Sequence, residues 1–170
     1  NTSVDEKKLK DVGLLTAEVP AGFNLHPKLT KLVETRKNMA LGKEPCDWGM
    51  AELLAYGSLL SEGTSVRLTG QDSVRGTFTH RHSAFYDTKT GEAYFPLKKL
   101  DSDTPQGRVD LCIYDSILSE YAVMGFEYGN SITDPSFLTM WEAQFGDFGN
   151  GAQIMIDQFI AAGESKWQQM

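Results

Sequence analysis

The order of apolar and polar positions predicts alternating strands and helices in the second half of the chain. Residues 109–114 form a nearly continuous apolar run, as expected of a buried strand in a parallel sheet. A helical pattern starts at Ser119, and residues 137–141 favour a second strand. Apolar residues between 152 and 163 recur at helical spacing and predict one amphipathic helix. Strand–helix–strand–helix order indicates right-handed βαβ units and therefore an α/β fold with a parallel sheet.

Two helices are expected in the first half of the chain, after a polar and mixed segment. That segment, residues 1–24, suggests a tail or an extended linker. Pro27 suits a first helical turn, and the helix that it opens should end near Gly42. Asp47 is a suitable N-cap for the second helix, in which Gly57 suggests close approach to another element.

Short strands and loops are expected between these helices and the βαβ units. Residues 65–69 predict a strand that ends in the polar residues 71–73. Aromatic runs flank the turn residues 88–91, which indicates a small hairpin outside the main sheet. Residues 101–108 are rich in turn formers and predict a surface loop.

Composition and charge favour an ordinary globular domain and argue against several other classes of protein. The chain has 170 residues, of which 41% are hydrophobic and 23% charged, as in an ordinary globular domain. Its 16 basic and 23 acidic residues give a net charge of −7, which argues against a nucleic-acid or anionic-membrane surface. Two cysteines, Cys46 and Cys112, do not resemble a secreted disulfide scaffold.

Glu120 is the first candidate for chemistry. It follows the predicted strand at residues 109–114 and lies in the first turn of the next helix. Acids are common in first turns because they interact favourably with the helix dipole. By position alone this structural interpretation is the more common one. Ligand sites of open α/β sheets also lie at the carboxyl ends of strands, so a functional interpretation stays open.

A loop rich in aromatic residues and glycine follows the next strand. Gly146, Gly149 and Gly151 precede a helix, where glycine-rich loops can bind phosphate. Their spacing matches neither the dinucleotide-binding nor the Walker A pattern. Glycines that allow aromatic rings to turn into a crevice explain the loop equally well. An acid and an aromatic ring together are suited to holding a flat heteroaromatic ligand.

His80 and His82 share a strand face and raise the question of a metal site. No third ligand stands at a recognisable spacing, so we predict no metal site. A substrate-facing or anion-binding loop and a solvated loop both remain open.

Several motifs spread over residues 45–170 together carry a family resemblance. They are Trp48-Gly49-Met50-Ala51-Glu52, Gly70-Gln71-Asp72-Ser73, Arg75-Gly76-Thr77-Phe78 with His80-Arg81-His82, Asp115-Ser116 with Leu118-Ser119-Glu120, Gly125-Phe126-Glu127-Tyr128-Gly129, Trp141 through Phe148, and Gly163-Glu164-Ser165-Lys166-Trp167. In these motifs the segment resembles the pyrimidine-binding domain of the 2-oxoglutarate dehydrogenases, which use thiamine diphosphate. Residues 1–44 resemble the linker and helix that precede it. The resemblance implies a three-layer α/β sandwich with a mostly parallel sheet, plus the small hairpin.

The resemblance also implies roles for individual residues. Glu120 matches the catalytic glutamate, which would hydrogen-bond N1′ of the cofactor's aminopyrimidine and favour its imino tautomer. Phe148 would stack on that ring, with Phe145 as the fallback. Leu118 would pack near the ring, and Gln71 matches a polar position on the cofactor side.

The loop with His80 and His82 lies toward the active centre in the family. Their roles stay open, with His82 the better candidate. The family holds Mg²⁺ and the diphosphate in a separate domain, through a Gly-Asp motif followed at a distance by paired asparagines. This combination does not occur here. We therefore expect a fragment of a larger chain that binds only the aminopyrimidine end and is inactive alone.

The complete enzyme implied by the resemblance is a homodimer of the tricarboxylic acid cycle. It would decarboxylate 2-oxoglutarate and reductively succinylate the lipoyl group of a succinyltransferase component, in the bacterial cytoplasm or the mitochondrial matrix. Two alternatives within the family are a 2-oxoglutarate decarboxylase and a 2-oxoadipate dehydrogenase. A non-catalytic binding module is the alternative of a different class.

Overall fold

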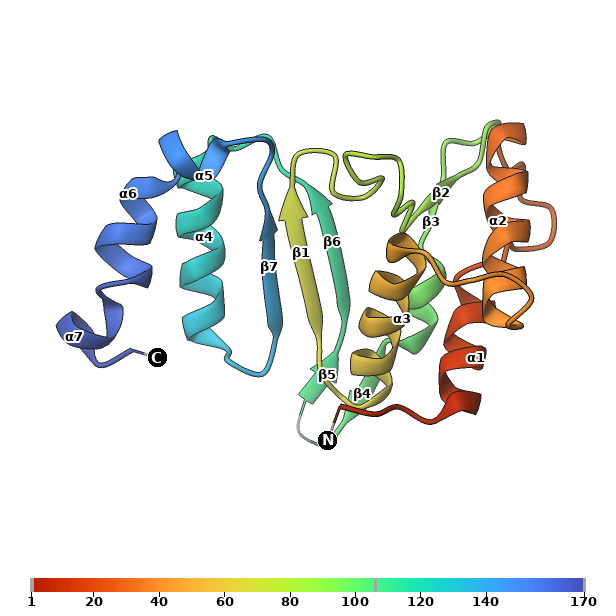
Figure 1. Ribbon diagram of the computed structural model, residues 1–170, viewed down its shortest axis with the longest axis horizontal. Coiled ribbons are helices and arrows are strands. Elements are labelled where there is room, and N and C mark those ends of the chain that lie inside the picture. The colour runs from red at the N-terminus through yellow and green to blue at the C-terminus, as the bar shows by residue number, and fades with distance from the viewer. Residues whose placement is uncertain (1, 106, 170) are drawn as a thin grey trace. The chain divides into compact units, whose positions relative to one another are not determined.

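A computed structural model describes residues 2–105 and 107–169. The chain forms two compact units, and Figure 1 shows their elements. The first unit comprises the residues up to 65 together with 74–111. The second comprises residues 66–73 and the chain from 112 onward.

Three helices dominate the first unit: α1 (Glu6–Leu15), α2 (Pro27–Ala40) and α3 (Trp48–Ser61). Asp47 caps α3 as predicted, because its carboxylate accepts a hydrogen bond from Met50 N at 2.7 Å. The close approach predicted at Gly57 is confirmed, since a Cβ there would lie 2.2 Å from Cγ1 of Val12 on α1.

The prediction of a tail or extended linker over residues 1–24 is wrong, because α1 lies within this segment and packs against α2 and α3. Asp5 caps it by accepting from Lys8 N at 3.2 Å. Only Val12 and Gly13 of the helix are buried, so the apolar stripe is too narrow to give a helical period.

The hairpin predicted around residues 88–91 is confirmed as the antiparallel pair β2 (Phe85–Tyr86) and β3 (Ala93–Tyr94). A short 3₁₀ helix, Pro96–Leu100, follows it. The surface loop predicted at residues 101–108 is instead a second hairpin, in which β4 (Ser102–Thr104) pairs with β5 (Gly107–Val109). Its strands are mostly exposed and polar, so their sequence resembles that of a loop.

The second unit is built on a three-stranded sheet in the order β6–β1–β7. Its strands are β1 (Val66–Gly70), β6 (Leu111–Asp115) and β7 (Leu138–Glu142). β1 and β7 are parallel, and the three arrows in Figure 1 point the same way. Helix α4 (Glu120–Thr133) connects β6 to β7 and packs against β7. The predicted α/β class with a parallel sheet is confirmed, although β6 begins two residues later than predicted.

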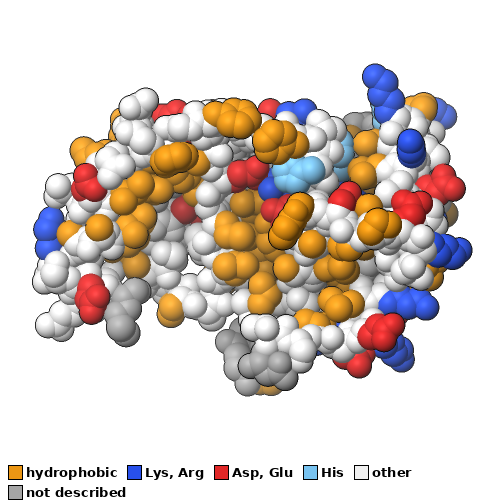
Figure 2. Space-filling model, viewed as in Figure 1, with side chains coloured by type: hydrophobic (Ala, Val, Ile, Leu, Met, Phe, Trp, Pro, Cys, Tyr) orange, Lys and Arg blue, Asp and Glu red, His pale blue; other side chains and the backbone are white. Residues whose placement is uncertain are grey.

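The single amphipathic helix predicted for residues 152–163 is divided. After the short α5 (Asp147–Asn150), α6 (Gln153–Met155) passes into a π-helical segment, Ile156–Ile160, and α7 (Gly163–Trp167) follows. Apolar periodicity indicates helix but does not distinguish a π turn from an α turn. Figure 2 shows apolar side chains at the surface over α4 and these helices, where Ile154 is 60% exposed.

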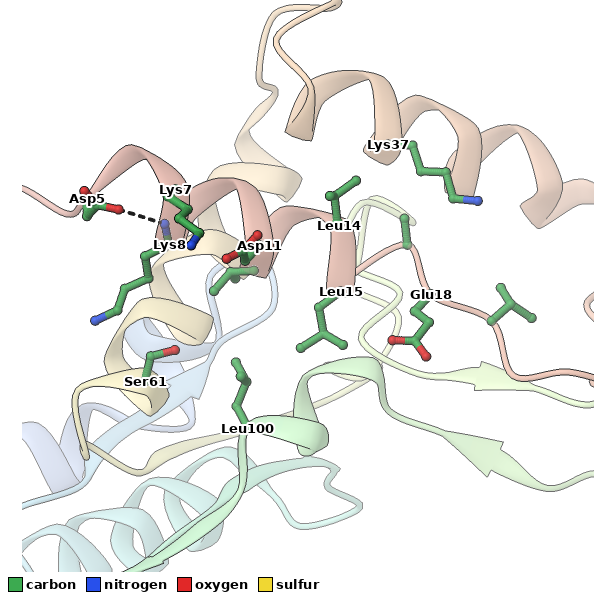
Figure 3. A pocket seen from close by; sticks show the side chains of 13 residues that line it. Asp5, Lys7, Lys8, Asp11, Leu14, Leu15, Glu18, Lys37, Ser61 and Leu100 are labelled. Carbon is green, nitrogen blue, oxygen red and sulfur yellow. Dashed lines mark hydrogen bonds between the residues drawn. The ribbon is translucent and has the colours of Figure 1, made fainter.

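A cavity of about 960 Å³ lies beside α1 in the first unit. Figure 3 shows Leu15 and Leu100 pointing toward one another in it, with the charged side chains of Lys8 and Glu18 on either side. None of the residues predicted to act in chemistry lines this cavity.

Candidate functional site

The candidate site lies at the carboxyl ends of the three parallel strands, within the second unit (Figure 1). Two hydrogen bonds connect the segments that leave these strands. Ser116 N, after β6, donates to Gly70 O at the end of β1 at 2.8 Å. Gln144 Nε2, after β7, donates to Gln71 O at 3.1 Å. The loops that follow all three strands are thereby held at one edge of the sheet.

Glu120 is the first residue of α4 and is partly buried. Ser119 occupies the N-cap position, and its carbonyl accepts the first helical hydrogen bond from Val123 N at 2.9 Å. The Glu120 side chain lies against Gly151, where an added Cβ would be 2.7 Å from Oε2. The acid and the loop after β7, predicted independently from sequence, are therefore in direct contact.

The loop after β7 is held at both ends. The Asp147 carboxylate accepts from Gln144 N at 3.0 Å, and Asp147 O accepts from Ala152 N at 3.1 Å. Ala152 itself is fully buried. Phe148, between Asp147 and Ala152, is 56% exposed, and Phe145, between Gln144 and Asp147, is 80% exposed. The loop thus presents two aromatic rings at the surface, with Phe148 three residues before the glycine that contacts Glu120.

Leu118 and Gln71 complete the set of predicted site residues. Leu118 is 46% exposed, and its N–H donates to Ser116 Oγ at 3.2 Å in the turn that leads into α4. Gln71 is exposed and joins the site through its carbonyl, which accepts from Gln144. The structure therefore brings all four predicted residues to this edge, without assigning a role to any of them.

Sequence reasoning missed an ion pair below this edge. Arg67 on β1 donates from Nε and Nη2 to the Glu127 carboxylate on α4 at 2.7 and 2.9 Å. The rings of Tyr114 and Phe126 lie 5.3 and 5.6 Å from the guanidinium carbon. The sequence does contain one sign of this ion pair, which is a charged residue, Arg67, inside a central strand. A buried charge requires a partner of opposite charge.

These side chains line a cavity of about 280 Å³ that opens near the loop after β6. Thr69 and Leu118 line it as well. Thr69 is 3% exposed, and its Oγ1 has no hydrogen-bond partner within the described part of the chain. The cavity therefore combines aromatic and aliphatic side chains with the Arg67–Glu127 ion pair and the unsatisfied hydroxyl of Thr69.

His80 and His82 lie in the first unit, within its segment 74–111. The segment between them is fixed by Arg81, whose guanidinium donates from Nε and Nη2 to the Glu52 carboxylate, each at 2.9 Å. His82 has a φ of +34°, and Arg75 O accepts from its N–H at 2.9 Å. Burial, followed by the charges of Arg36 and Arg75, lowers the pKa of His82 below its usual 6.5. No cluster of three or more metal-ligating side chains occurs in residues 2–105 and 107–169.

The site fits a flat heteroaromatic ring. Its carboxylate can accept from or share a proton with a ring nitrogen, and the neighbouring phenylalanines offer faces for stacking. The bare Cα of Gly151 leaves the space that the carboxylate occupies. Among the described helices, none is long and apolar enough to cross a bilayer.

Comparison with known proteins gives two findings. The family model described as "Transketolase, pyrimidine binding domain" matches residues 44–170. Curated relatives match nearly the whole chain. The 2-oxoglutarate dehydrogenase E1 component of Rickettsia conorii is 51% identical over 169 residues, which are 99% of this chain and 18% of the relative. That of Coxiella burnetii is 50% identical over 170 residues, 100% of this chain and 18% of the relative.

A relative with a different name is equally similar. The "Multifunctional 2-oxoglutarate metabolism enzyme" of Mycobacterium sp. (strain JLS) is 51% identical over 173 residues, covering 99% of this chain and 13% of the relative. The chain thus spans less than a fifth of the length of these relatives.

Proposed function

This chain belongs to the family of transketolase pyrimidine-binding domains, and from that premise we propose that it binds the aminopyrimidine ring of thiamine diphosphate in a 2-oxoglutarate dehydrogenase. Identity of about half to E1 components, sustained over nearly the whole chain, supports this assignment. In the proposal, residues 45–170 form the domain and residues 1–44 precede it. The observation that carries the proposal is the contact of Glu120 with Gly151, in the loop that also exposes the ring of Phe148.

Glu120 holds a proton at N1′ of the aminopyrimidine in this proposal. Its position at the first turn of α4 directs the carboxylate to the edge of the sheet, where the ring would lie. A carboxyl that shares a proton with N1′ favours the imino form of the ring, because that form requires N1′ to be protonated. Thiamine diphosphate, when bound, supplies the nucleophilic carbon and the electron sink for decarboxylating a 2-oxo acid.

Phe148 orients the ring by stacking on its face, and Phe145 is the fallback for this role. Leu118 packs against the ring edge and keeps water from the carboxylate. Gln71 contributes polar contacts from the end of β1. Exposure of Phe148 and Leu118 supports this arrangement, because a bound ring would cover apolar surface that is otherwise in contact with water.

The remaining functions belong to the complete enzyme. We propose that Mg²⁺ and the diphosphate are bound outside this chain, and that the enzyme is a homodimer whose second subunit completes the site. Ile117, next to Leu118, is fully exposed, which supports a covering partner at this edge. The enzyme would decarboxylate 2-oxoglutarate and transfer a succinyl group to the lipoyl group of a succinyltransferase, in the bacterial cytoplasm or the mitochondrial matrix.

One finding favours a second candidate reaction. The name of the mycobacterial relative joins several activities toward 2-oxoglutarate, and its identity to this chain is as high as that of the E1 components. A non-oxidative 2-oxoglutarate decarboxylase is therefore the alternative, and a 2-oxoadipate dehydrogenase is a third possibility within the same chemistry.

Steady-state rates of the complete enzyme test the proposal. We expect CO₂ release from 2-oxoglutarate that exceeds that from 2-oxoadipate, depends on thiamine diphosphate, and is coupled to succinylation of a lipoyl domain. Release without lipoyl succinylation would favour the decarboxylase. Absence of any reaction with 2-oxo acids, together with no binding of thiamine diphosphate, would leave a non-catalytic module.

A further inference from the structure

The backbone of Gly151 does not explain why this position is glycine. Its φ of −73° and ψ of −28° are right-handed helical values that every L-residue adopts. Alanine at such a position restricts the unfolded chain and fits helical geometry better than glycine does. The reason for glycine at position 151 must therefore be that a side chain has no space around the Cα atom.

That space is occupied by Glu120. A Cβ on Gly151 would lie 2.7 Å from Oε2, 2.8 Å from Cβ and 2.9 Å from Cδ of Glu120. Rotation of the side chain can move Oε2 away, but Cβ of Glu120 is fixed by the first turn of α4. Ordinary contact begins at 3.4 Å, so the loop or the helix end must shift by at least 0.6 Å, the difference between 3.4 and 2.8 Å.

Neither segment can shift freely. Ala152, the next residue, is fully buried and donates to Asp147 O at 3.1 Å. The start of α4 follows a turn in which Ser116 N donates to the end of β1. A side chain at position 151 would therefore displace the Glu120 carboxylate rather than be absorbed by the loop.

We propose that Gly151 is a positioning residue, whose bare Cα lets the loop backbone lie against Glu120 and fix the direction of its carboxylate. This inference rests on the proposed role of Glu120 at the aminopyrimidine. Gly129 provides a matched control, since it lies in α4 and a Cβ there meets no atom within 4 Å.

The test is a double-mutant cycle in the complete enzyme, with the Kd of thiamine diphosphate at saturating Mg²⁺ as the readout and kcat as a second measurement. Gly151→Ala should raise Kd and lower kcat by about 100-fold, the effect expected of a misplacement near 1 Å. Gly129→Ala should change neither value. Glu120→Gly removes all three contacting atoms, so adding Gly151→Ala to it should leave Kd unchanged.

A merely structural effect on the loop would weaken binding equally in both backgrounds, and that result would overturn the inference. If Gly151→Ala does not assemble, assembly of the double variant Glu120→Gly/Gly151→Ala would support it, and failure of both would overturn it. If Gly151→Ala has a normal Kd and kcat while Glu120→Gly has a raised Kd and a lowered kcat, only this inference is overturned. A near-normal Glu120→Gly enzyme would overturn the proposed function and this inference with it.

Discussion

Arg67 on β1 and Glu127 on α4 form a two-pronged ion pair that fastens the helix to the centre of the sheet. Their side chains are only 18% and 5% exposed. The hydrogen bonds to Glu127 raise the pKa of the Arg67 guanidinium. Glu127 lies two helical turns after Glu120, on the same face of α4. The pair therefore fixes the helix that carries the proposed catalytic acid.

Removal of one partner should loosen the second unit. Glu127→Leu leaves the guanidinium without its counter-charge, and we expect a loss of about 3 kcal/mol in local stability. Arg67→Met/Glu127→Leu should regain most of this loss, because two apolar side chains need no partner. Hydrogen–deuterium exchange of β1 and α4 peptides in the complete protein measures both variants.

The exposed pair of Arg108 and Asp103, with side chains 61% and 85% exposed, provides the control. Asp103→Asn should change exchange in its own hairpin little, because exposed ion pairs contribute little. Equal protection of α4 in Glu127→Leu and in the unmodified protein would contradict the structural role of the buried pair.

Acid should weaken the first unit through His82. Burial lowers its folded-state pKa below 6.5, so in acid the unfolded state binds a proton that the folded state does not. The stability contributed by neutral His82 is therefore complete above about pH 6.5 and declines below it, until the folded-state pKa is reached.

His82→Asn should flatten this decline, since asparagine does not titrate and tolerates the positive φ at this position. Exchange of the peptide that contains residues 74–85, corrected for intrinsic rates, is compared at about pH 5.5 and about pH 7.5. A steeper loss of protection in the unmodified protein is expected. Identical pH dependence in both proteins would show that another group is responsible.

Phe148 and Phe145 can be distinguished by their effects on cofactor binding. A stacking contact contributes about 1 kcal/mol beyond burial, so Phe148→Ala should raise the Kd of thiamine diphosphate about fivefold or more. Phe145→Ala should have a smaller effect. Fluorescence titration of the complete enzyme measures both. A larger effect at Phe145 would transfer the stacking role to that ring.

Local signals were sufficient to predict the elements that form the site. The apolar run before Tyr114 and the polar turn into Ser119 placed Glu120 at a helix start, and the structure has α4 begin at that residue. The glycines after the strand at residues 137–141 indicated a loop that binds phosphate or turns aromatic rings into a crevice. Each of these features depends on neighbours in sequence, which is why pattern and capping rules describe them.

Features set by contacts between distant segments were not predictable in the same way. α1 buries few residues, so its helical period is weak and its partners α2 and α3 stabilise it. The contact between Glu120 and Gly151 joins the first turn of α4 to the loop after β7, and nothing in either local sequence specifies it. The proposed role of Glu120 comes from the resemblance to a family, because physical reasoning alone left that role open.

The central claim is that Glu120 acts on the cofactor rather than merely opening a helix. Its most direct test is single-turnover release of CO₂ from 2-oxoglutarate by the complete enzyme at saturating thiamine diphosphate, with Glu164→Ala as the control. Glu164 is an exposed acid in the first turn of the short helix α7, so it shares the first-turn position of Glu120. Glu120→Ala should lower the rate by about 10²- to 10⁴-fold, the range for loss of a general acid–base group, while Glu164→Ala leaves it unchanged. A near-normal rate for Glu120→Ala would contradict the account.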